Sequence, residues 1–546
     1  MQGQARYGPV PLRTRPAALP FLMAVAPRAF ERLTLRLLTP VDALCNRLYG
    51  WRYNPLYQSG TIVVALYLVL VVTGVWLTVF YRIGAPWESV ARITANPWAG
   101  SWVRTLHRYA SDLAVLATLV HAMRMFAQAR SWGPRALAWM SGGVLLLLIF
   151  VCGWTGYVMV WDTFGQYLAR EGARMLDALP VLSEPTSRAF TGEQPLPSAF
   201  FFLNLFAHIA IPLAMGVVFW IHVRRVARAQ LLPPRRMTWG IVGGLTAIAV
   251  AWPVAMAPKA DPFALPERIP ADLFFAFWLP LSAEVGGGAA LLLATALGAA
   301  LVSVPFITTR RGAARPEPSW VDEDICTGCV QCSLDCPYGA IEMRDRSGPR
   351  SPLVAHVDPA LCVSCGICAG SCPPMGVGPP GRTGRDQLLQ AREFLARTRL
   401  AGRVVAIGCN QAVERFAPDF TAAGALPYGI NCAGSLHTSV IELFIREGAG
   451  GVLVIACPPR DCWNREGPRW LAERVYHDRE AELQARVDRA RVRLVHANAG
   501  ERRAALEALR AFQTDVAALG SPGADEDRAP DVECEPVAQP RRRRRL

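Results

Sequence analysis

Long apolar runs are absent from the second part of this sequence, and a glycine-rich dinucleotide-binding motif is absent throughout. After residue 316 no uncharged stretch is long enough to cross a bilayer as a helix, so we expect that part to be soluble. No G-x-G-x-x-G pattern opens a helix, which argues against a flavin or nicotinamide site in this chain. The sequence also has only eight histidines, so histidines that recur at a regular spacing are informative.

The first 310 residues, by contrast, carry long uncharged runs, each long enough to span a bilayer. These runs lie at 61–80, 136–161, 197–223, 237–258 and 285–309. A sixth candidate, at about 102–123, contains Arg108 and Asp112, and ionisable residues inside a span indicate function. The sequence therefore predicts an all-α membrane bundle of six helices.

The net charge of +14 is unevenly distributed along the chain. Arginines dominate the N-terminal segment and the segments that follow the second, fourth and sixth spans, whereas the alternate loops are acidic or balanced. This positive-inside pattern predicts a prokaryotic inner-membrane protein with both termini cytoplasmic, and contact with lipid rather than nucleic acid. No cleavable signal peptide is evident, and the final basic residues 541–545 are typical of a disordered tail.

Two histidine pairs repeat one spacing inside the predicted membrane helices. His107 and His121 are fourteen positions apart in one helix, and His208 and His222 in another. Fourteen residues make nearly four turns, about 21 Å, so both members of a pair share a helix face. The two helices run in the same direction, which would set His107 opposite His208 and His121 opposite His222. Facing imidazole pairs in a bundle core suit haem iron, so we predict two haems b.

Glycine pairs with the same spacing occur in the first and third spans. They are Gly60 with Gly74 and Gly142 with Gly156. Glycine lets a backbone approach a large ring closely, so we expect these positions to give the haems room.

Four segments of this module resemble the cytochrome b subunit of quinol-oxidising cytochrome bc complexes. They are "RTLH" (104–107), "HAMR" (121–124), "TGYVMVWDTFGQY" (155–167) and "ADPFALPERIPADLFF" (260–275). The resemblance covers roughly residues 45–310. It implies a quinone substrate, pairing of Arg104 with a propionate of the outer haem, and a possible homodimer.

Two positions depart from that family. Its Pro-Glu-Trp-Tyr motif, whose glutamate takes a proton from quinol, has Ala271 at the glutamate position. The neighbouring Asp272 either replaces it or has a helix-capping or solvated role. Leu203 stands where the family has an arginine five residues before the first histidine of the fourth helix.

Fifteen cysteines are many for a chain with a cytoplasmic half, where thiols stay reduced and grouped cysteines bind metal. Two runs, 326–337 and 362–373, have the pattern C-x2-C-x2-C-x3-C-P of a two-cluster bacterial ferredoxin, in which the fourth cysteine of each run binds the other run's cluster. One predicted [4Fe–4S] set is Cys326, Cys329, Cys332 and Cys372, and the other is Cys362, Cys365, Cys368 and Cys336.

The last predicted domain alternates apolar strands with helices, which indicates an α/β fold with a parallel sheet. Its strands are expected at 403–409, 426–432, 451–457 and 492–498. Strand-end and loop cysteines at one sheet edge favour one [2Fe–2S] cluster held by Cys409, Cys432, Cys457 and Cys462. The alternative is that they are ordinary buried cysteines.

"GVLVIACPPRDCWNREG" (451–467) resembles the delta subunit of methyl-viologen-reducing hydrogenase, which links a hydrogenase to heterodisulfide reductase. That family commonly has a further cysteine where this chain has Ala412.

These features predict five regions in a multidomain chain. They are a cytoplasmic amphipathic segment (1–55), a cytochrome b-like membrane domain (56–311), a two-[4Fe–4S] ferredoxin domain of α+β type (317–380), a delta-subunit-like [2Fe–2S] domain (385–520) and a disordered basic tail (521–546). We expect an electron-transfer subunit that connects the quinone pool to a cytoplasmic flavoprotein, hydrogenase or heterodisulfide-reductase-like partner, in either direction. A redox sensor without turnover is the alternative from another class.

Overall fold

The computed structural model describes residues 18–179, 186–190, 196–224, 230–261, 272–308, 316–347, 351–458, 461–464, 466–498 and 500–520. Two compact units make up the chain, Met1–Pro316 and Glu317–Leu546. Ala271 and the basic tail over 521–546 lie outside the described residues.

The first unit folds into helices. They are α1 (Ala18–Tyr53), α2 (Ser59–Phe80), α3 (Pro86–Ala95), α4 (Gly100–Ala127), α5 (Ala136–Val160), α6 (Thr163–Leu176), α7 (Ser198–Arg224), α8 (Arg235–Ala251), α9 (Leu279–Val285) and α10 (Gly287–Thr308), with the short turns η1 (Gly133–Arg135) and η2 (Thr186–Phe190).

Five helices in the described residues are long and apolar enough to cross a membrane: α2, α4, α5 with η1, α7 and α10. The remaining predicted run, 237–258, corresponds to α8, which is a helix of 17 residues and ends at Ala251. At about 1.5 Å per residue α8 spans about 25 Å, short of a hydrocarbon core of about 30 Å. The six-helix count therefore stays a prediction.

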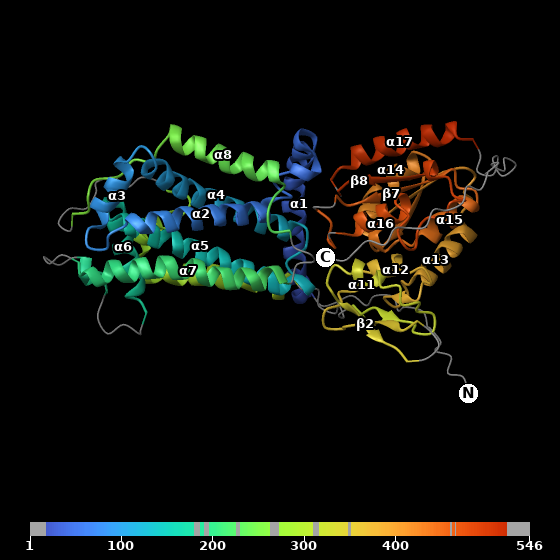
Figure 1. Ribbon diagram of the computed structural model, residues 1–546, viewed down its shortest axis with the longest axis horizontal. Helices are drawn as coiled ribbons and strands as arrows, with labels where there is room; N and C mark the ends of the chain where they lie inside the picture. The colour runs from blue at the N-terminus through green and yellow to red at the C-terminus, as the bar shows by residue number, and fades with distance from the viewer. Residues whose placement is uncertain are drawn as a thin grey trace, which may run out of the picture. The chain divides into compact units, whose positions relative to one another are not determined.

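The long helices pack in pairs and form two layers. Helix α2 packs along α4 and α5 along α7, while α4 contacts α5 between the layers. Figure 1 shows α2 and α4 beside each other, and α5 beside α7. Helix α8 packs on α4, and α10 on α5. This pairing places each predicted histidine helix against one predicted glycine helix.

Helix α1 presents an exposed apolar stripe. Residues 30, 33, 37, 41, 44 and 48 are large apolar side chains, each at least 44% exposed, and they recur at helical spacing. Such a stripe is typical of a helix that lies in a bilayer interface. On another face of α1, Asp42 forms a buried ion pair with Arg124 of α4. The Arg124 guanidinium also lies 4.3 Å from the centre of the Tyr57 ring.

The second unit begins with short elements that hold two antiparallel strand pairs, β1 with β4 and β2 with β3. They are β1 (Trp320–Val321), α11 (Gln331–Asp335), β2 (Ile341–Asp345), β3 (Leu353–Val357), α12 (Ile367–Gly370) and β4 (Val377–Gly378). Its core contains the apolar residues Ile341, Ala355 and Val377 together with several cysteines.

The remainder of the second unit is built on a four-stranded parallel sheet with strand order β6-β5-β7-β8. Its elements are α13 (Gly384–Arg397), β5 (Val404–Cys409), α14 (Asn410–Ala422), β6 (Leu426–Ile430), η3 (Ala433–Ser435), α15 (Thr438–Arg446), β7 (Gly451–Ala456), α16 (Gly467–Tyr476), η4 (Arg489–Arg491), β8 (Val492–His496) and α17 (Arg502–Ala518). The predicted parallel sheet is confirmed, with each strand within two residues of its expected bounds.

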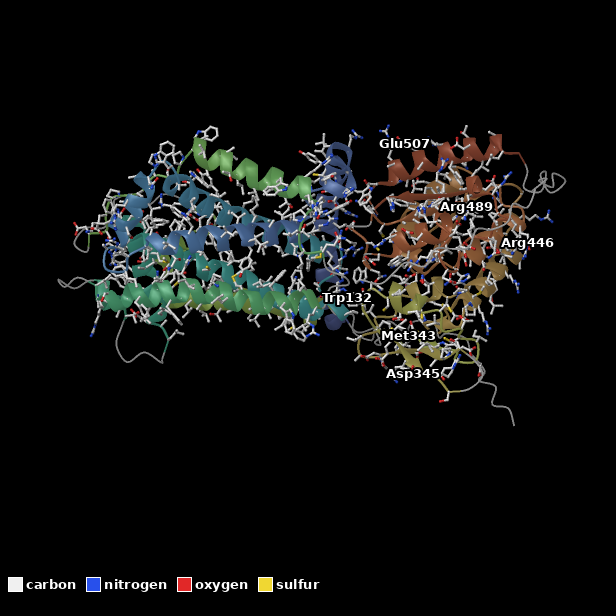
Figure 2. All side chains as sticks on the ribbon, viewed as in Figure 1. Trp132, Met343, Asp345, Arg446, Arg489 and Glu507 are labelled. Carbon is white, nitrogen blue, oxygen red and sulfur yellow. The ribbon has the colours of Figure 1, made fainter. Side chains whose placement is uncertain are left out.

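Helices cover both faces of this sheet. One apolar core joins the sheet to α13, α15 and α16, and another joins it to α14 and α17. Strands β5 and β7 are runs of Val, Ile, Leu and Ala, as central parallel strands buried on both faces require. Charged side chains such as Arg446, Arg489 and Glu507 are exposed at the surface of this layer (Figure 2).

Candidate redox centres

The imidazole rings of His107 on α4 and His208 on α7 face each other inside the first unit. Their centres are 6.4 Å apart and their planes are inclined by 56°. Metal–imidazole bonds of about 2.0–2.1 Å, with each ring centre about 1.2 Å behind its nitrogen, would separate two opposed ring centres by about 6.4 Å. The spacing therefore fits one metal atom bound between the two rings.

The glycines of α2 and α5 make room for the imidazole rings themselves. A Cβ on Gly74 would lie 3.3 Å from His107 Cε1, and one on Gly156 would lie 3.0 Å from His208 Cε1. The other two glycines have the same relation to the second histidine pair. A Cβ on Gly60 would lie 2.9 Å from His121 Cε1, and one on Gly142 would lie 3.2 Å from His222 Cε1. The sequence predicts that these glycines give room to the haem ring, whereas their contacts in the structure are with the imidazole rings.

A hydroxyl group precedes each of these glycines and lies beside the Nδ1 atom of the same histidine. Thr73 Oγ1 lies 2.8 Å from His107 Nδ1, and Thr155 Oγ1 lies 3.0 Å from His208 Nδ1. In the other pair, Ser141 Oγ lies 3.1 Å from His222 Nδ1 and Ser59 Oγ lies 3.4 Å from His121 Nδ1.

The hydrogen-bond inventory favours one direction for these contacts, and His208 Nδ1 also lies 3.0 Å from the Cys152 carbonyl, which can only accept. Thr73 donates its only hydroxyl proton to the Val69 carbonyl at 2.7 Å, so it accepts from His107 Nδ1–H. The other three hydroxyls also donate to a carbonyl of their own helix or of the turn before it. With its proton on Nδ1, each histidine presents an Nε2 lone pair, the arrangement that a metal ligand needs.

These four hydroxyl residues are not among the predicted site residues, although the sequence contains a signal for them. The dipeptides Ser-Gly (59–60 and 141–142) and Thr-Gly (73–74 and 155–156) recur at the same spacing of fourteen as the histidines. The Ser or Thr position alone is uninformative, because hydroxyls in membrane helices commonly bond their own backbone.

Arg104 contacts backbone near the end of α8 in this structure. Its Nη1 atom donates to the Val254 carbonyl at 2.8 Å, and the Val254 N–H donates to Thr105 Oγ1 at 3.0 Å. The predicted pairing of Arg104 with a haem propionate stays a prediction. Leu203, where the family has arginine, is 63% exposed on α7.

Asp272 has a capping role. Its Oδ1 atom accepts hydrogen bonds from the backbone N–H groups of residues 274–276 at 2.6–3.2 Å. Its Oδ2 atom accepts from Arg108 Nη2 at 2.7 Å and from the Tyr157 hydroxyl. The sequence leaves three roles open for Asp272: replacement of the glutamate, helix capping or a solvated position. The contacts in the structure are those of a helix cap.

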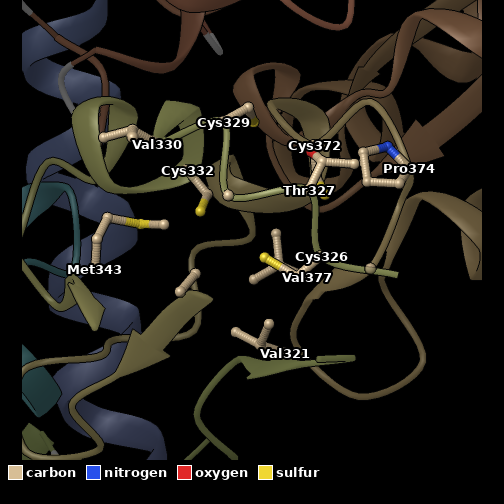
Figure 3. A pocket seen from close by; sticks show the side chains of 13 residues that line it. Val321, Cys326, Thr327, Cys329, Val330, Cys332, Met343, Cys372, Pro374 and Val377 are labelled. Atoms are coloured by element: carbon tan, nitrogen blue, oxygen red, sulfur yellow. The ribbon is translucent and has the colours of Figure 1, made fainter. Parts of the chain in front are cut away.

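The cysteines of the first ferredoxin set line one cavity with an apolar wall. Cys326, Cys329, Cys332 and Cys372 all contribute to it. Figure 3 shows the sulfur atoms of Cys326 and Cys332 pointing into this space, with Met343 and Val377 nearby. Burial, and then neighbouring thiols that include Cys372, raise the pKa of Cys332. A coordinated iron would bind these side chains as thiolates instead.

The second ferredoxin set is gathered in the same way. Burial raises the pKa of Cys365 well above its usual value, and the thiols of Cys368, Cys336 and Cys362 add to the effect. Backbone N–H groups point at two of the sulfurs, from Ala340 to Cys336 and from Ser319 to Cys362, each at 3.3 Å. Amide hydrogen bonds to sulfur are one of the means by which proteins tune iron–sulfur clusters.

The four cysteines of the α/β domain are connected by a series of contacts, from Cys409 through Cys457 and Cys462 to Cys432. Cys457, after β7, contacts both Cys409 at the end of β5 and Cys462, and these contacts with burial raise its pKa well above the usual value. Contact with Cys462 is likewise the first cause of the raised pKa of Cys432, ahead of burial. The carboxyl ends of parallel strands thus bring the predicted set together.

In the described parts of the chain, no three His, Cys, Asp or Glu side chains are gathered as tightly as a single metal ion requires. An iron–sulfur cluster distributes its cysteines over several metal atoms, so a shared buried cavity is the better test of fit. The first ferredoxin set lines such a cavity, and in each of the other two sets the thiols lie close enough to raise one another's pKa.

Three protein-family models match consecutive parts of the chain. Residues 48–230 match cytochrome b/b6/petB, residues 325–375 match a 4Fe-4S dicluster domain, and residues 424–520 match the delta subunit of methyl-viologen-reducing hydrogenase. The chain joins domains of all three families. The cytochrome b domain contains all four paired histidines, and the dicluster domain contains all eight ferredoxin cysteines, while Cys409 precedes the matched part of the delta-subunit-like domain.

This combination makes the chain a multi-pass membrane electron-transfer subunit. The cytochrome b domain implies haem b, and the dicluster domain implies iron–sulfur clusters. A solved structure titled "Hyperthermophilic respiratory Complex III" is also similar, with 14% identity, a TM-score of 0.38, and coverage of 46% of this chain and 75% of its own.

Proposed function

We propose that the chain transfers electrons between membrane quinone and a soluble oxidoreductase. The route uses two haems b, two [4Fe–4S] clusters and one [2Fe–2S] cluster. The observation that carries the proposal is the metal-sized gap between His107 and His208, in a chain that also gathers three sets of four cysteines.

In this proposal His107 and His208 bind the outer haem, and His121 and His222 the inner one. Haem iron supplies one-electron chemistry at each site. The four glycines let the imidazole rings approach α2 and α5, and the four hydroxyls hold each ring in the tautomer that presents Nε2. Arg104 remains the candidate for a haem propionate.

Contacts within the second unit support an order for the cysteine sets. Asn431, which precedes Cys432, donates from Nδ2 to the Cys365 carbonyl at 3.4 Å. Tyr338 donates to Asn464 Oδ1 at 3.1 Å, and Asn464 in turn hydrogen-bonds the Cys432 thiol. We therefore assign the set Cys336, Cys362, Cys365 and Cys368 as the neighbour of the [2Fe–2S] set. The set that contains Cys326 is then the one that exchanges electrons with haem.

The remaining assignments follow from the charge pattern and the domain order. The arginine-rich loops are assigned to the cytoplasmic side. Both termini are cytoplasmic as well if α8 and the residues after it complete a sixth membrane crossing. The inner haem is then the one that exchanges electrons with the cysteine sets. We keep the five-region division at 1–55, 56–311, 317–380, 385–520 and 521–546. Electron flow in either direction, and a homodimer, are compatible with these assignments.

Redox difference spectroscopy in membranes tests the proposal. Addition of a short-chain quinol to air-oxidised membranes that contain the full chain should reduce b-type haem, and a quinone-site inhibitor should block that reduction. Haems that dithionite reduces but that never respond to quinol, to quinone or to the inhibitor would refute it.

A second candidate differs in the partner alone. The match of residues 424–520 to a hydrogenase delta subunit favours an anchor for a hydrogenase or heterodisulfide-reductase-like complex. Affinity purification of the full chain from its native membranes distinguishes the candidates. A co-purified hydrogenase or heterodisulfide reductase subunit favours the anchor, and a different flavoprotein favours the broader proposal.

The alternative from another class is a redox sensor without turnover. A metal-loaded chain that never exchanges electrons with quinone or any partner would favour that alternative.

A further inference from the structure

A charged cluster lies inside the first unit where α4, α5 and the segment at Asp272 meet. Arg108 forms ion pairs with Asp112, one turn later on α4, and with Asp272. Its guanidinium lies 4.6 Å from the centre of the Tyr157 ring. Arg108 and Asp112 belong to a membrane-spanning helix, where charged side chains are costly and mark a site of function.

Hydrogen-bond accounting separates the two carboxylates of the cluster. Asp272 accepts five hydrogen bonds, three from backbone N–H groups and one each from Arg108 and Tyr157. Burial alone would raise the pKa of Asp272, but the backbone donors, Tyr157 and Arg108 hold it below its usual value. A carboxylate in this state is a weak base with no vacant acceptor position, so Asp272 is unsuited to receive a proton.

Asp112 is in the opposite condition. It accepts a hydrogen bond from Arg108 at Oδ1, which leaves acceptor capacity on Oδ2. Its side chain is 20% exposed, against 7% for Asp272. A partly exposed carboxylate in a membrane helix requires water or a polar ligand beside it, because hydrocarbon cannot solvate the charge.

Aromatic rings surround this cluster on the side of α5. Phe275 lies 6.2 Å from Tyr157 and 6.4 Å from Phe150, measured between ring centres. A Cβ on Gly153 would lie only 2.1 Å from the Phe275 ring, so the segment after Asp272 packs tightly on α5. A quinol presents an aromatic ring with a hydroxyl group at each end, and it matches a site that combines aromatic walls with one available carboxylate.

Resting on the proposed function, we propose that Asp112 is the group that accepts the quinol proton at the outer site, in place of the glutamate that Ala271 replaces. The O–H bond of the quinol breaks and its proton moves to Oδ2 of Asp112, giving the carboxylic acid. The electrons leave one at a time to the haem b expected at His107 and His208, the second after the first has moved on to the haem expected at His121 and His222. The second quinol proton leaves by the same route after Asp112 has released the first proton to water. Quinone reduction runs the same proton transfer backwards. Arg108 orients the carboxylate, and Asp272 anchors the loop.

The test compares Asp112→Asn with wild type in the full, haem-loaded chain reconstituted in lipid nanodiscs, with decylubiquinol as the probe. General-base catalysis typically contributes 10²–10⁴-fold, so we expect haem reduction by quinol to slow at least about 100-fold. The wild-type rate of haem reduction by quinol should rise with pH as the Asp112 carboxylate ionises. The charged or polar groups that face it are Arg108, Asp272 and Tyr157. This pH dependence should vanish in Asp112→Asn. Asp112→Glu, which keeps the base, should restore both properties.

Controls separate a chemical role from a structural one. The haem spectrum and reduction by dithionite should be unchanged in Asp112→Asn, and Glu88→Gln, which removes an exposed carboxylate paired with Lys259 outside the spans, should leave the quinol rate unchanged. A quinol rate and pH profile in Asp112→Asn equal to wild type would overturn the assignment of Asp112 and leave the proposed function standing. A wild-type chain that quinol fails to reduce would refute the proposed function itself, and the assignment with it.

Discussion

His107 and His208 come from helices separated by 70 residues of chain, yet their imidazole rings face each other with centres 6.4 Å apart. The rings are held by glycine clearance and hydroxyl hydrogen bonds from α2 and α5. The site is therefore two histidine-bearing helices supported by two backing helices, and each support can be removed separately.

The first prediction concerns the backing glycines. Valine at Gly156 adds a Cβ only 3.0 Å from His208 Cε1, so the ring must turn away from α5. We expect the Gly156→Val chain to retain one haem instead of two, as measured by haem-to-protein ratio and redox titration. Gly216→Val on α7 is the matched control, because a Cβ there meets nothing within 4 Å. Two fully occupied haems in Gly156→Val would contradict this role.

The second prediction concerns the hydroxyl groups. Thr73→Val keeps the shape of the side chain but removes one of the acceptors for His107 Nδ1–H, which makes the imidazole a weaker donor to ferric iron. A hydrogen bond worth about 1 kcal/mol corresponds to about 40 mV for one electron, so we expect the outer haem potential to rise by about that amount. Potentiometric titration at the haem band measures it. Thr78→Val on the same helix, whose hydroxyl bonds the Gly74 carbonyl, should leave both potentials unchanged.

Sequence spacing predicted that His107 and His208 lie opposite each other, because α-helical geometry converts a repeat of fourteen into a shared face. The tautomer was not predictable in the same way, because it depends on which hydroxyl lies beside Nδ1 across a helix pair. The order of the cysteine sets likewise required the structure, since Asn431 and Cys365 are 66 residues apart in the chain. The length of α8 was overestimated because hydropathy over 237–258 counts residues that follow the helix end at Ala251.

The third prediction tests the order of the cysteine sets. In the reduced full chain, the electron paramagnetic resonance signal of the [2Fe–2S] site should show magnetic interaction with its neighbour. Cys365→Ala should remove or alter that interaction, because Asn431 and Asn464 place Cys432 beside this set. Cys329→Ala, in the other set, should preserve it. The reverse result would exchange the order of the two [4Fe–4S] sites.

The fourth prediction concerns a buried cation in the second unit. Arg474 of α16 is fully buried and donates to Ser371 Oγ at 2.9 Å and to the Gly434 carbonyl at 2.8 Å. It lies 3.9 Å from the Asp335 carboxylate, which Arg479 also contacts. Burial lowers the pKa of Arg474 to about 10, so the side chain stays charged at neutral pH and ties the ferredoxin residues to the α/β domain.

Removal of Arg474 leaves Ser371, the Gly434 carbonyl and part of the Asp335 charge without this buried partner. Breaking such a buried pair costs about 3–5 kcal/mol, so amide exchange in residues 467–476 should accelerate at least about 100-fold in Arg474→Ala. Hydrogen–deuterium exchange of the full chain measures this. Arg469→Ala on the same helix removes a side chain that is 58% exposed. This control should change the free energy of opening that amide exchange reports by less than about 1 kcal/mol. Equal exchange in the two variants would show that the Arg474 contacts do not hold the two parts of this unit together.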